Sequence, residues 1–173
     1  SFSEYARAPQ LETEPVDLRV LVSDVAELYL ANHTITTEVS SEVPVFELDP
    51  DKIRQVLHNL IKNAVEASDN NYAVVSISAD VECENGGNHL DIRVSDQGNG
   101  FPADILEQVF EPYVTSKPKG TGLGLAIVKK IVEEHGGRVR VENNGNGGGL
   151  VIMRFPTTHP AHAVEPVPKS EVV

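Results

Sequence analysis

Apolar side chains recur every three or four positions in several parts of the chain, which predicts amphipathic helices. Such stripes occur in residues 16–32 (Leu18, Leu21, Val22, Val25, Leu28), in residues 48–68 (Ile53, Val56, Leu57, Leu60, Ile61, Ala64) and in residues 122–137. Asp49 is a suitable N-cap for the second helix, with Pro50 at its first position. Shorter helical patterns cover residues 1–8 and 102–110.

Alternating and β-branched runs predict strands at residues 34–40, 45–48, 72–83, 89–96, 138–143 and 149–155. Residues 84–88 (ENGGN) and the Gly/Asn-rich residues 143–149 have the composition of hairpin turns. Because the strands come in hairpins and do not strictly alternate with helices, we predict an α+β fold. It would be a two-layer α/β sandwich with a mixed, mostly antiparallel sheet and helices on one face.

The 173 residues suffice for one domain with a hydrophobic core. With aromatics at 5% and no tryptophan, that core must consist mainly of Val, Ile, Leu and Ala. Proline and polar residues divide the chain into a helix end and linker (1–15), a domain (16–156) and a tail expected to be disordered (157–173). Since the chain does not start with Met, we expect it to be part of a longer protein.

The formal net charge of −12 argues against a nucleic-acid partner, because phosphate backbones are bound by clustered Lys and Arg. The single Cys83 suits a reducing compartment. No apolar run approaches the ~20 residues of a membrane span. We therefore expect a cytoplasmic chain without direct membrane contact; an inner-membrane anchor elsewhere in the intact protein is left open.

One face of the predicted helix 48–68 carries amide side chains. Asn59, Asn63 and Glu66 are spaced by four and three residues, and Lys62 adjoins them. Amide oxygens suit Mg²⁺, which takes few protein ligands and completes its shell with phosphate and water. The alternative is an ordinary solvated polar face, which this helix alone would favour.

A second candidate is Asp96, which ends a predicted strand and is followed by Gly98 and Gly100. An acid placed there could accept a hydrogen bond from an exocyclic amine. The alternative is a common Asp/Gly turn.

A third candidate is the glycine series Gly120, Gly122 and Gly124, which leads into a helix just after Lys117 and Lys119. Free backbone N–H groups and the helix dipole favour phosphate at such a start, and glycine permits close approach. Neither a P-loop nor a dinucleotide fingerprint fits this spacing.

Together these segments resemble the ATP-binding catalytic domain, of the Bergerat fold, of bacterial two-component sensor histidine kinases. The likeness covers about residues 16–156, and its finer details are most similar to the nitrogen-regulation group. The matching motifs are NLIKNAVEA (59–67), DQGNG (96–100), FEPY (110–113), GTGLGL (120–125) and GNGGG (145–149).

The resemblance implies ATP and Mg²⁺ as cofactors and a role for each matched residue. Asn63 would bind Mg²⁺, Asn59 and Lys62 would hold phosphates, and Asp96 would bind the adenine amine in a pocket shaped by Gly98 and Gly100. A mobile lid, about residues 101–121, would be anchored by Phe110, and Lys117 would take the place of the family's lid arginine beside Lys119. The phosphates would be wrapped by Gly120, Thr121, Gly122, Leu123 and Gly124.

The chain departs from the family pattern at two of these motifs. Glu66 stands where many members have lysine, so we do not count it as a ligand. Gly149 stands where a threonine often faces the adenine, which leaves that contact open.

The resemblance also implies the reaction. Hydrolytic relatives carry glutamate where this chain has Asn59, so we expect phosphoryl transfer to a histidine, with Asn59 and Lys117 as catalytic residues, and not hydrolysis. No histidine of the chain lies in the acceptor motif. The acceptor would lie on a separate dimerisation domain of a homodimeric protein, which then passes the phosphoryl group to an aspartate of a response-regulator receiver domain.

Some alternatives stay open. His58 could orient the acceptor or be a half-buried helix residue. The chain could be a nucleotide-binding regulatory module without kinase activity, a serine kinase of the anti-sigma-factor type, or a structural protein. The signal, the regulator and the oligomeric state of this chain cannot be predicted.

Overall fold

The computed structural model describes residues 11–112 and 124–157. Its helices are α2 (Leu18–Glu27), α3 (Pro50–Glu66) and α4 (Gly124–Glu134), with short 3₁₀ turns η1 (Asp69–Asn71) and η2 (Leu106–Gln108). Its strands are β1 (Glu14–Val16), β2 (Thr34–Val39), β3 (Phe46–Leu48), β4 (Val74–Glu84), β5 (Gly87–Asp96), β6 (Arg138–Asn143) and β7 (Gly149–Pro156). The predicted helix at 1–8 and the tail from residue 158 onward lie outside the described residues.

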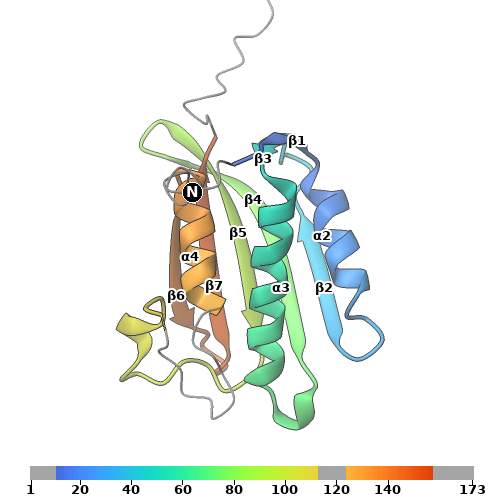
Figure 1. The fold of residues 1–173 in the computed structure, drawn as a ribbon, viewed down its shortest axis with the longest axis vertical. Helices are drawn as coiled ribbons and strands as arrows, with labels where there is room; N and C mark the ends of the chain where they lie inside the picture. The colour runs from blue at the N-terminus through green and yellow to red at the C-terminus, as the bar shows by residue number, and fades with distance from the viewer. Residues whose placement is uncertain (1–10, 113–123, 158–173) are drawn as a thin grey trace, which may run out of the picture.

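Five strands form the main sheet in the order β2-β4-β5-β7-β6. Only the β2–β4 pair in this sheet is parallel, and the other pairs are antiparallel. Helices α2, α3 and α4 lie on one face of the sheet (Figure 1). The predicted α+β sandwich with a mixed, mostly antiparallel sheet is thus confirmed.

The core lies between this sheet face and the helices. Alternate residues of β5, Leu90, Ile92 and Val94, point to it, and all six residues of the predicted α3 stripe are buried. The cap prediction is also confirmed, because the Asp49 side chain accepts a hydrogen bond from the backbone N–H of Lys52 at 3.2 Å. The sequence period therefore predicted which face of α3 is buried.

Three local predictions were wrong. Residues 14–16, assigned largely to a linker, form β1, which pairs with β3 and buries Val16. The helix expected at 102–110 is only the turn η2, since the segment buries a single apolar side chain, Val109, and has no continuous stripe. The helix predicted within residues 16–32 is α2, which ends at Glu27, so Leu28 is exposed instead of belonging to the buried stripe.

A buried histidine joins the end of α4 to the start of α3. His135 Nε2 accepts a hydrogen bond from the Asp49 backbone N–H at 3.1 Å, and His135 Nδ1 donates to the Ile131 carbonyl at 2.8 Å. These two contacts define a neutral ring protonated at Nδ1. With the end of α4 fixed beside the start of α3, the two helices run in opposite directions (Figure 1). The start of α4 therefore lies near the end of α3.

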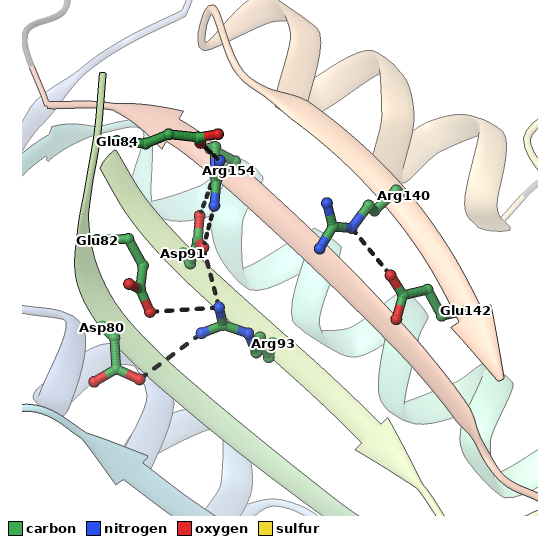
Figure 2. Close-up of polar contacts among 8 residues, drawn as sticks. All are labelled: Asp80, Glu82, Glu84, Asp91, Arg93, Arg140, Glu142 and Arg154. Carbon is green, nitrogen blue, oxygen red and sulfur yellow. Dashed lines mark hydrogen bonds and ion pairs between the residues drawn. The ribbon is translucent and has the colours of Figure 1, made fainter. Parts of the chain in front are cut away.

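The opposite sheet face is polar and carries a buried carboxylate (Figure 2). Asp91 on β5 is fully buried and accepts two hydrogen bonds from the Arg154 guanidinium, at 2.8 and 2.9 Å. Arg93 contacts the same carboxylate at 3.1 Å and also pairs with Asp80 and Glu82, while Arg154 pairs with Glu84. Burial raises the pKa of Asp91, but hydrogen bonding from Arg154 and the charges of Arg154 and Arg93 outweigh it, so the net shift is downward.

We expect Asp91→Asn to lower the free energy of unfolding by about 2–3 kcal/mol at neutral pH, less than for a fully buried pair because both arginines are partly exposed. Since the native-state pKa of Asp91 lies below its ordinary value of 3.8, the wild-type advantage is fully present above that pH. It is lost as the pH falls through the native-state pKa. Urea denaturation at several pH values measures the difference.

Glu142→Gln is the matched control, because Glu142 forms a solvent-exposed pair with Arg140 on the same sheet face (Figure 2). It should change stability little. An Asp91→Asn effect no larger than that of Glu142→Gln, or one independent of pH, would contradict this description of the outer face.

Candidate nucleotide site

The amide face of α3 and the start of α4 lie side by side, as the sequence predicted. A Cβ added to Gly124, the first residue of α4, would lie 3.4 Å from Asn63 Oδ1 and 3.5 Å from its Nδ2. This is ordinary van der Waals distance, so the amide of Asn63 directly faces the start of the second helix. The positive end of the α4 dipole is thus next to a polar face that could bind phosphate.

Asn59 lies one turn before Asn63 and is half-buried. Its Nδ2 is inaccessible to solvent and has no hydrogen-bond partner among the described residues. The side-chain amide of a solvated surface residue would be accessible to water. The alternative of an ordinary solvated polar face is therefore wrong at Asn59. An unpaired buried donor costs free energy unless a ligand supplies an acceptor.

Other residues of this helix are more exposed. Lys62 and Glu66 both lie at the surface, where Lys62 can reach a phosphate by its flexible side chain. His58 Nδ1 lies 2.6 Å from the hydroxyl of Tyr29, which follows α2 in the chain and whose pKa is raised by burial. This contact accounts for His58 as a half-buried packing residue.

Asp96, at the end of β5, has one oxygen engaged and one available. Its Oδ1 accepts hydrogen bonds from the backbone N–H groups of Gly98 at 2.8 Å and Gly149 at 3.3 Å. No described residue donates to its Oδ2. The backbone therefore orients the carboxylate and leaves a single acceptor for an amine.

The glycines around Asp96 are required by close contacts. A Cβ on Gly98 would lie 2.7 Å from the Ala67 carbonyl oxygen at the end of α3. Gly100 has a φ of +71°, and its Cβ would lie 2.5 Å from the Gly147 carbonyl oxygen. These contacts bring the end of α3, the loop after β5 and the β6–β7 turn together around one carboxylate.

Two residues of this region were missed by the sequence interpretation. Phe101 and Asn143 exchange a pair of hydrogen bonds: Phe101 N–H donates to Asn143 Oδ1 at 2.7 Å, and Asn143 Nδ2 donates to the Phe101 carbonyl at 2.8 Å. They are 42 positions apart in the chain, and neither belongs to a recognised motif, so no local signal could have paired them.

Of the remaining predicted site residues, the structure describes only Phe110. Phe110 is half-buried just after η2. The others, which lie outside the described residues, are Lys117, Lys119, Gly120, Thr121, Gly122 and Leu123. Their roles, and the lid itself, stay predictions.

The donor set fits a magnesium phosphate better than an ion bound by protein alone. Within residues 11–112 and 124–157, no group of three or more His, Cys, Asp or Glu side chains could hold a metal ion. Mg²⁺ needs no such group when phosphate and water fill most of its coordination shell. The amide of Asn63 and the unpaired Nδ2 of Asn59 suit that arrangement.

Residues 48–159 match the protein family described as histidine kinase-, DNA gyrase B-, and HSP90-like ATPase. The chain belongs to this family. Within it, the chain is 34% identical to the sensor histidine kinase ZraS of Escherichia coli (strain K12), over 88% of this chain and 33% of ZraS. It is also 34% identical to an NtrY-like sensor histidine kinase of Rickettsia bellii (strain RML369-C), over 89% of this chain and 25% of that protein. The chain thus spans about a third of these relatives or less.

Solved structures of this family have the same fold. The catalytic domain of histidine kinase ThkA superposes with a TM-score of 0.74 at 32% identity, covering 88% of this chain and all of that domain. Full-length ShkA in complex with AMPPNP gives 0.73 at 31% identity, over 88% of this chain and 33% of ShkA. ThkA in complex with the response regulator TrrA gives 0.72 at 29% identity, over 93% of this chain and 46% of that chain. The predicted resemblance to sensor histidine kinases is confirmed.

Along the stretches that the structure describes, none of the helices is both long and apolar enough to span a membrane.

We expect Asn59→Leu, which keeps the branched shape and removes the unpaired donor, to stabilise the nucleotide-free chain by roughly 1 kcal/mol. The same change should weaken ATP binding, because the donor would pair only with a bound ligand. Chemical denaturation without nucleotide and calorimetry with Mg²⁺·ATP measure the two effects.

Asn88→Leu is the matched control, since Asn88 is exposed near the hairpin at the far end of β5. It should leave ATP affinity unchanged. If Asn59→Leu destabilised the nucleotide-free chain, or left ATP affinity at the wild-type value, Nδ2 of Asn59 would not be a ligand donor.

Proposed function

We propose that this chain binds Mg²⁺·ATP and transfers the γ-phosphoryl group to a histidine on a separate dimerisation domain of the same protein. The observation that carries the proposal is the closeness of the Asn63 amide to the first residue of α4, where an added Cβ would lie 3.4 Å from Asn63 Oδ1. It would join a cation-binding face to a phosphate-binding helix start, an arrangement that suits a transferable phosphoryl group. The names of the relatives, sensor histidine kinases, support the same reaction.

Each part of the nucleotide has a candidate partner on this chain. The free Oδ2 of Asp96 would accept a hydrogen bond from an exocyclic amine of the base, while backbone N–H groups hold Oδ1. The start of α4, the Asn59 donor and the Lys62 ammonium would bind the phosphates, together with Lys117. Asn63 would contribute an amide oxygen to Mg²⁺.

The transfer needs positioning and charge neutralisation more than covalent help from the protein. The bond between the γ-phosphorus and the bridging oxygen breaks, the leaving oxygen stays on ADP, and a phosphorus–nitrogen bond forms on the acceptor imidazole. Bound Mg²⁺ would neutralise part of the phosphate charge. An amide at position 59 cannot act as a general base toward water, which favours transfer over hydrolysis.

The partners follow from this reaction. The acceptor histidine would belong to the dimerisation domain of a homodimeric intact protein, and the phosphoryl group would pass to an aspartate of a response regulator. The complex of ThkA with TrrA supports a partner of that kind. Nitrogen regulation as the signalling context is supported by the NtrY-like relative, although ZraS is equally similar. A cytoplasmic location is part of the same proposal.

The test is phosphoryl transfer in trans. The chain is mixed with Mg²⁺, γ-labelled ATP and a purified histidine-bearing dimerisation domain, and acid-labile, base-stable phosphohistidine is measured. We expect label on the acceptor domain and none on this chain alone. ATP binding without any transfer would favour a regulatory module, and label in acid-stable phosphoserine would favour a serine kinase.

Two substitutions show whether the site is the one described. Asp96→Asn should abolish most ATP binding, because it replaces the carboxylate that accepts the base amine with an amide, whereas Lys117→Ala should weaken binding only modestly. Equal small effects in calorimetry would contradict the assignment of Asp96.

A further inference from the structure

Strands β1 and β3 form a two-stranded sheet separate from the main one. Glu14 of β1 lies opposite Leu48 of β3 in this antiparallel pair, and the residue after Leu48 is Asp49, the N-cap of α3. Both strands lie beside the start of α3 (Figure 1). This small sheet therefore joins the segment that leads into β1 to the beginning of α3.

The side chain of Asp49 makes the same connection a second time. It is 6% exposed, and its carboxylate accepts hydrogen bonds from the backbone N–H groups of Lys52 at 3.2 Å and Glu12 at 3.0 Å. Its own N–H donates to His135 Nε2 at 3.1 Å, and its carbonyl accepts from the Ile53 N–H at 3.0 Å. Every polar atom of Asp49 is thus engaged, with partners before β1, in α3 and just after α4.

Capping alone does not explain an aspartate at position 49. A helix cap needs one side-chain oxygen, and serine, threonine or asparagine supplies it about as well. A buried carboxylate is also more costly than these neutral groups unless it is fully hydrogen-bonded. Its second oxygen binds the N–H of Glu12, which is 37 positions away in the chain. The extra acceptor thus serves the link to the segment before β1.

The link extends to α4 through His135. The other ring nitrogen, Nδ1, donates to the Ile131 carbonyl at 2.8 Å, and the ring of Phe155 on β7 meets the imidazole edge-on, with centroids 5.9 Å apart. The ring cannot turn away without losing these contacts. A displacement of Asp49 would therefore reach the end of α4 as well as the start of α3.

We propose that Asp49 is a positioning residue for phosphoryl transfer, which ties the segment before β1 to the joined ends of α3 and α4 and so makes the fit between Asn63 and Gly124 depend on that segment. The inference rests on the proposed nucleotide site. The 17 residues of α3 span about 25 Å. Because a helix moves as a nearly rigid rod, a shift where α3 begins changes how its far end meets the start of α4.

The first test is Asp49→Asn, which keeps the shape and one capping oxygen but removes the second acceptor. Its amide would present a donor to the Glu12 N–H, so the link should break while the cap persists. We expect Mg²⁺·ATP to bind about fivefold more weakly, the equivalent of one net hydrogen bond. A residue that only caps α3 would leave the affinity unchanged, because asparagine is an equally good N-cap.

The second test removes the other partner of the same hydrogen bond. Glu12→Pro deletes the N–H and should weaken ATP binding by a similar factor, whereas Glu12→Ala keeps the N–H and should bind as the wild type does. In the Asp49→Asn background the link is already broken. Adding Glu12→Pro there should therefore cost little more.

A spectroscopic readout separates positioning from stability. In the nucleotide-free chain, NMR resonances of the Asn63 side-chain amide and the Gly124 backbone amide should shift in Asp49→Asn. A residue that only stabilises the fold would lower the free energy of unfolding without moving folded-state resonances at the far end of α3. Asp17→Asn is the matched control, since Asp17 caps α2 by accepting from the Arg19 N–H at 3.0 Å. It should shift neither resonance.

Calorimetry measures the affinities at a temperature where thermal denaturation shows each variant folded, and Asp49→Asn carries the test alone if Glu12→Pro does not fold. Wild-type ATP affinity or unshifted resonances in Asp49→Asn, or additive effects of the two substitutions, would overturn this inference. Failure of the wild type to bind ATP would instead overturn the proposed function. The NMR comparison needs no nucleotide, so the two failures are distinguishable.

Discussion

The arrangement of the site depends on two antiparallel helices packed side by side on one sheet face. The apolar stripe of α3 fixes its rotation, so that Asn63 faces the start of α4 and not the sheet. The buried, neutral His135 fixes the other end, where its ring accepts a hydrogen bond from the N-cap residue of α3. With one pair of ends joined, regular helix geometry determines which residues meet at the other pair. The core thus sets the distance between the proposed cation-binding face of α3 and the proposed phosphate-binding start of α4.

The proposed base pocket around Asp96 is organised differently, mainly by backbone groups. Asp96 is oriented by two N–H groups, and Gly98 and Gly100 admit carbonyl oxygens at distances that a side chain would prevent. Its parts come from the end of α3, the loop after β5 and the β6–β7 turn. A proposed base pocket organised by backbone contacts, beside helix ends that could bind phosphates, is an arrangement that suits an ATP-binding domain.

Much of this could be predicted from the sequence, for identifiable reasons. The 3.6-residue period of α3 and the alternation in β5 reflect burial directly, so the predictions of the buried helix face and of a strand at residues 89–96 were correct. The closeness of Asn63 to Gly124 agrees with the family resemblance, which implies that both residues lie at one nucleotide. The predictions that failed depended on tertiary context: β1 is three residues long and carries a proline, and α2 ends before Leu28, which is exposed. The hydrogen-bonded pair of Phe101 and Asn143 joins segments 42 residues apart. Asp91 lies on the outer sheet face and is buried, whereas a charged residue in a strand normally predicts a solvent-exposed side chain.

The most direct test of the central geometry is paramagnetic NMR of the isotopically labelled chain with Mn²⁺·ATP in place of Mg²⁺·ATP. A metal held between α3 and α4 should broaden the side-chain amide of Asn63 and the backbone amide of Gly124 together, and leave Arg140 on the outer sheet face unaffected. Broadening of only one of the two, or of neither while ATP is bound, would contradict the account.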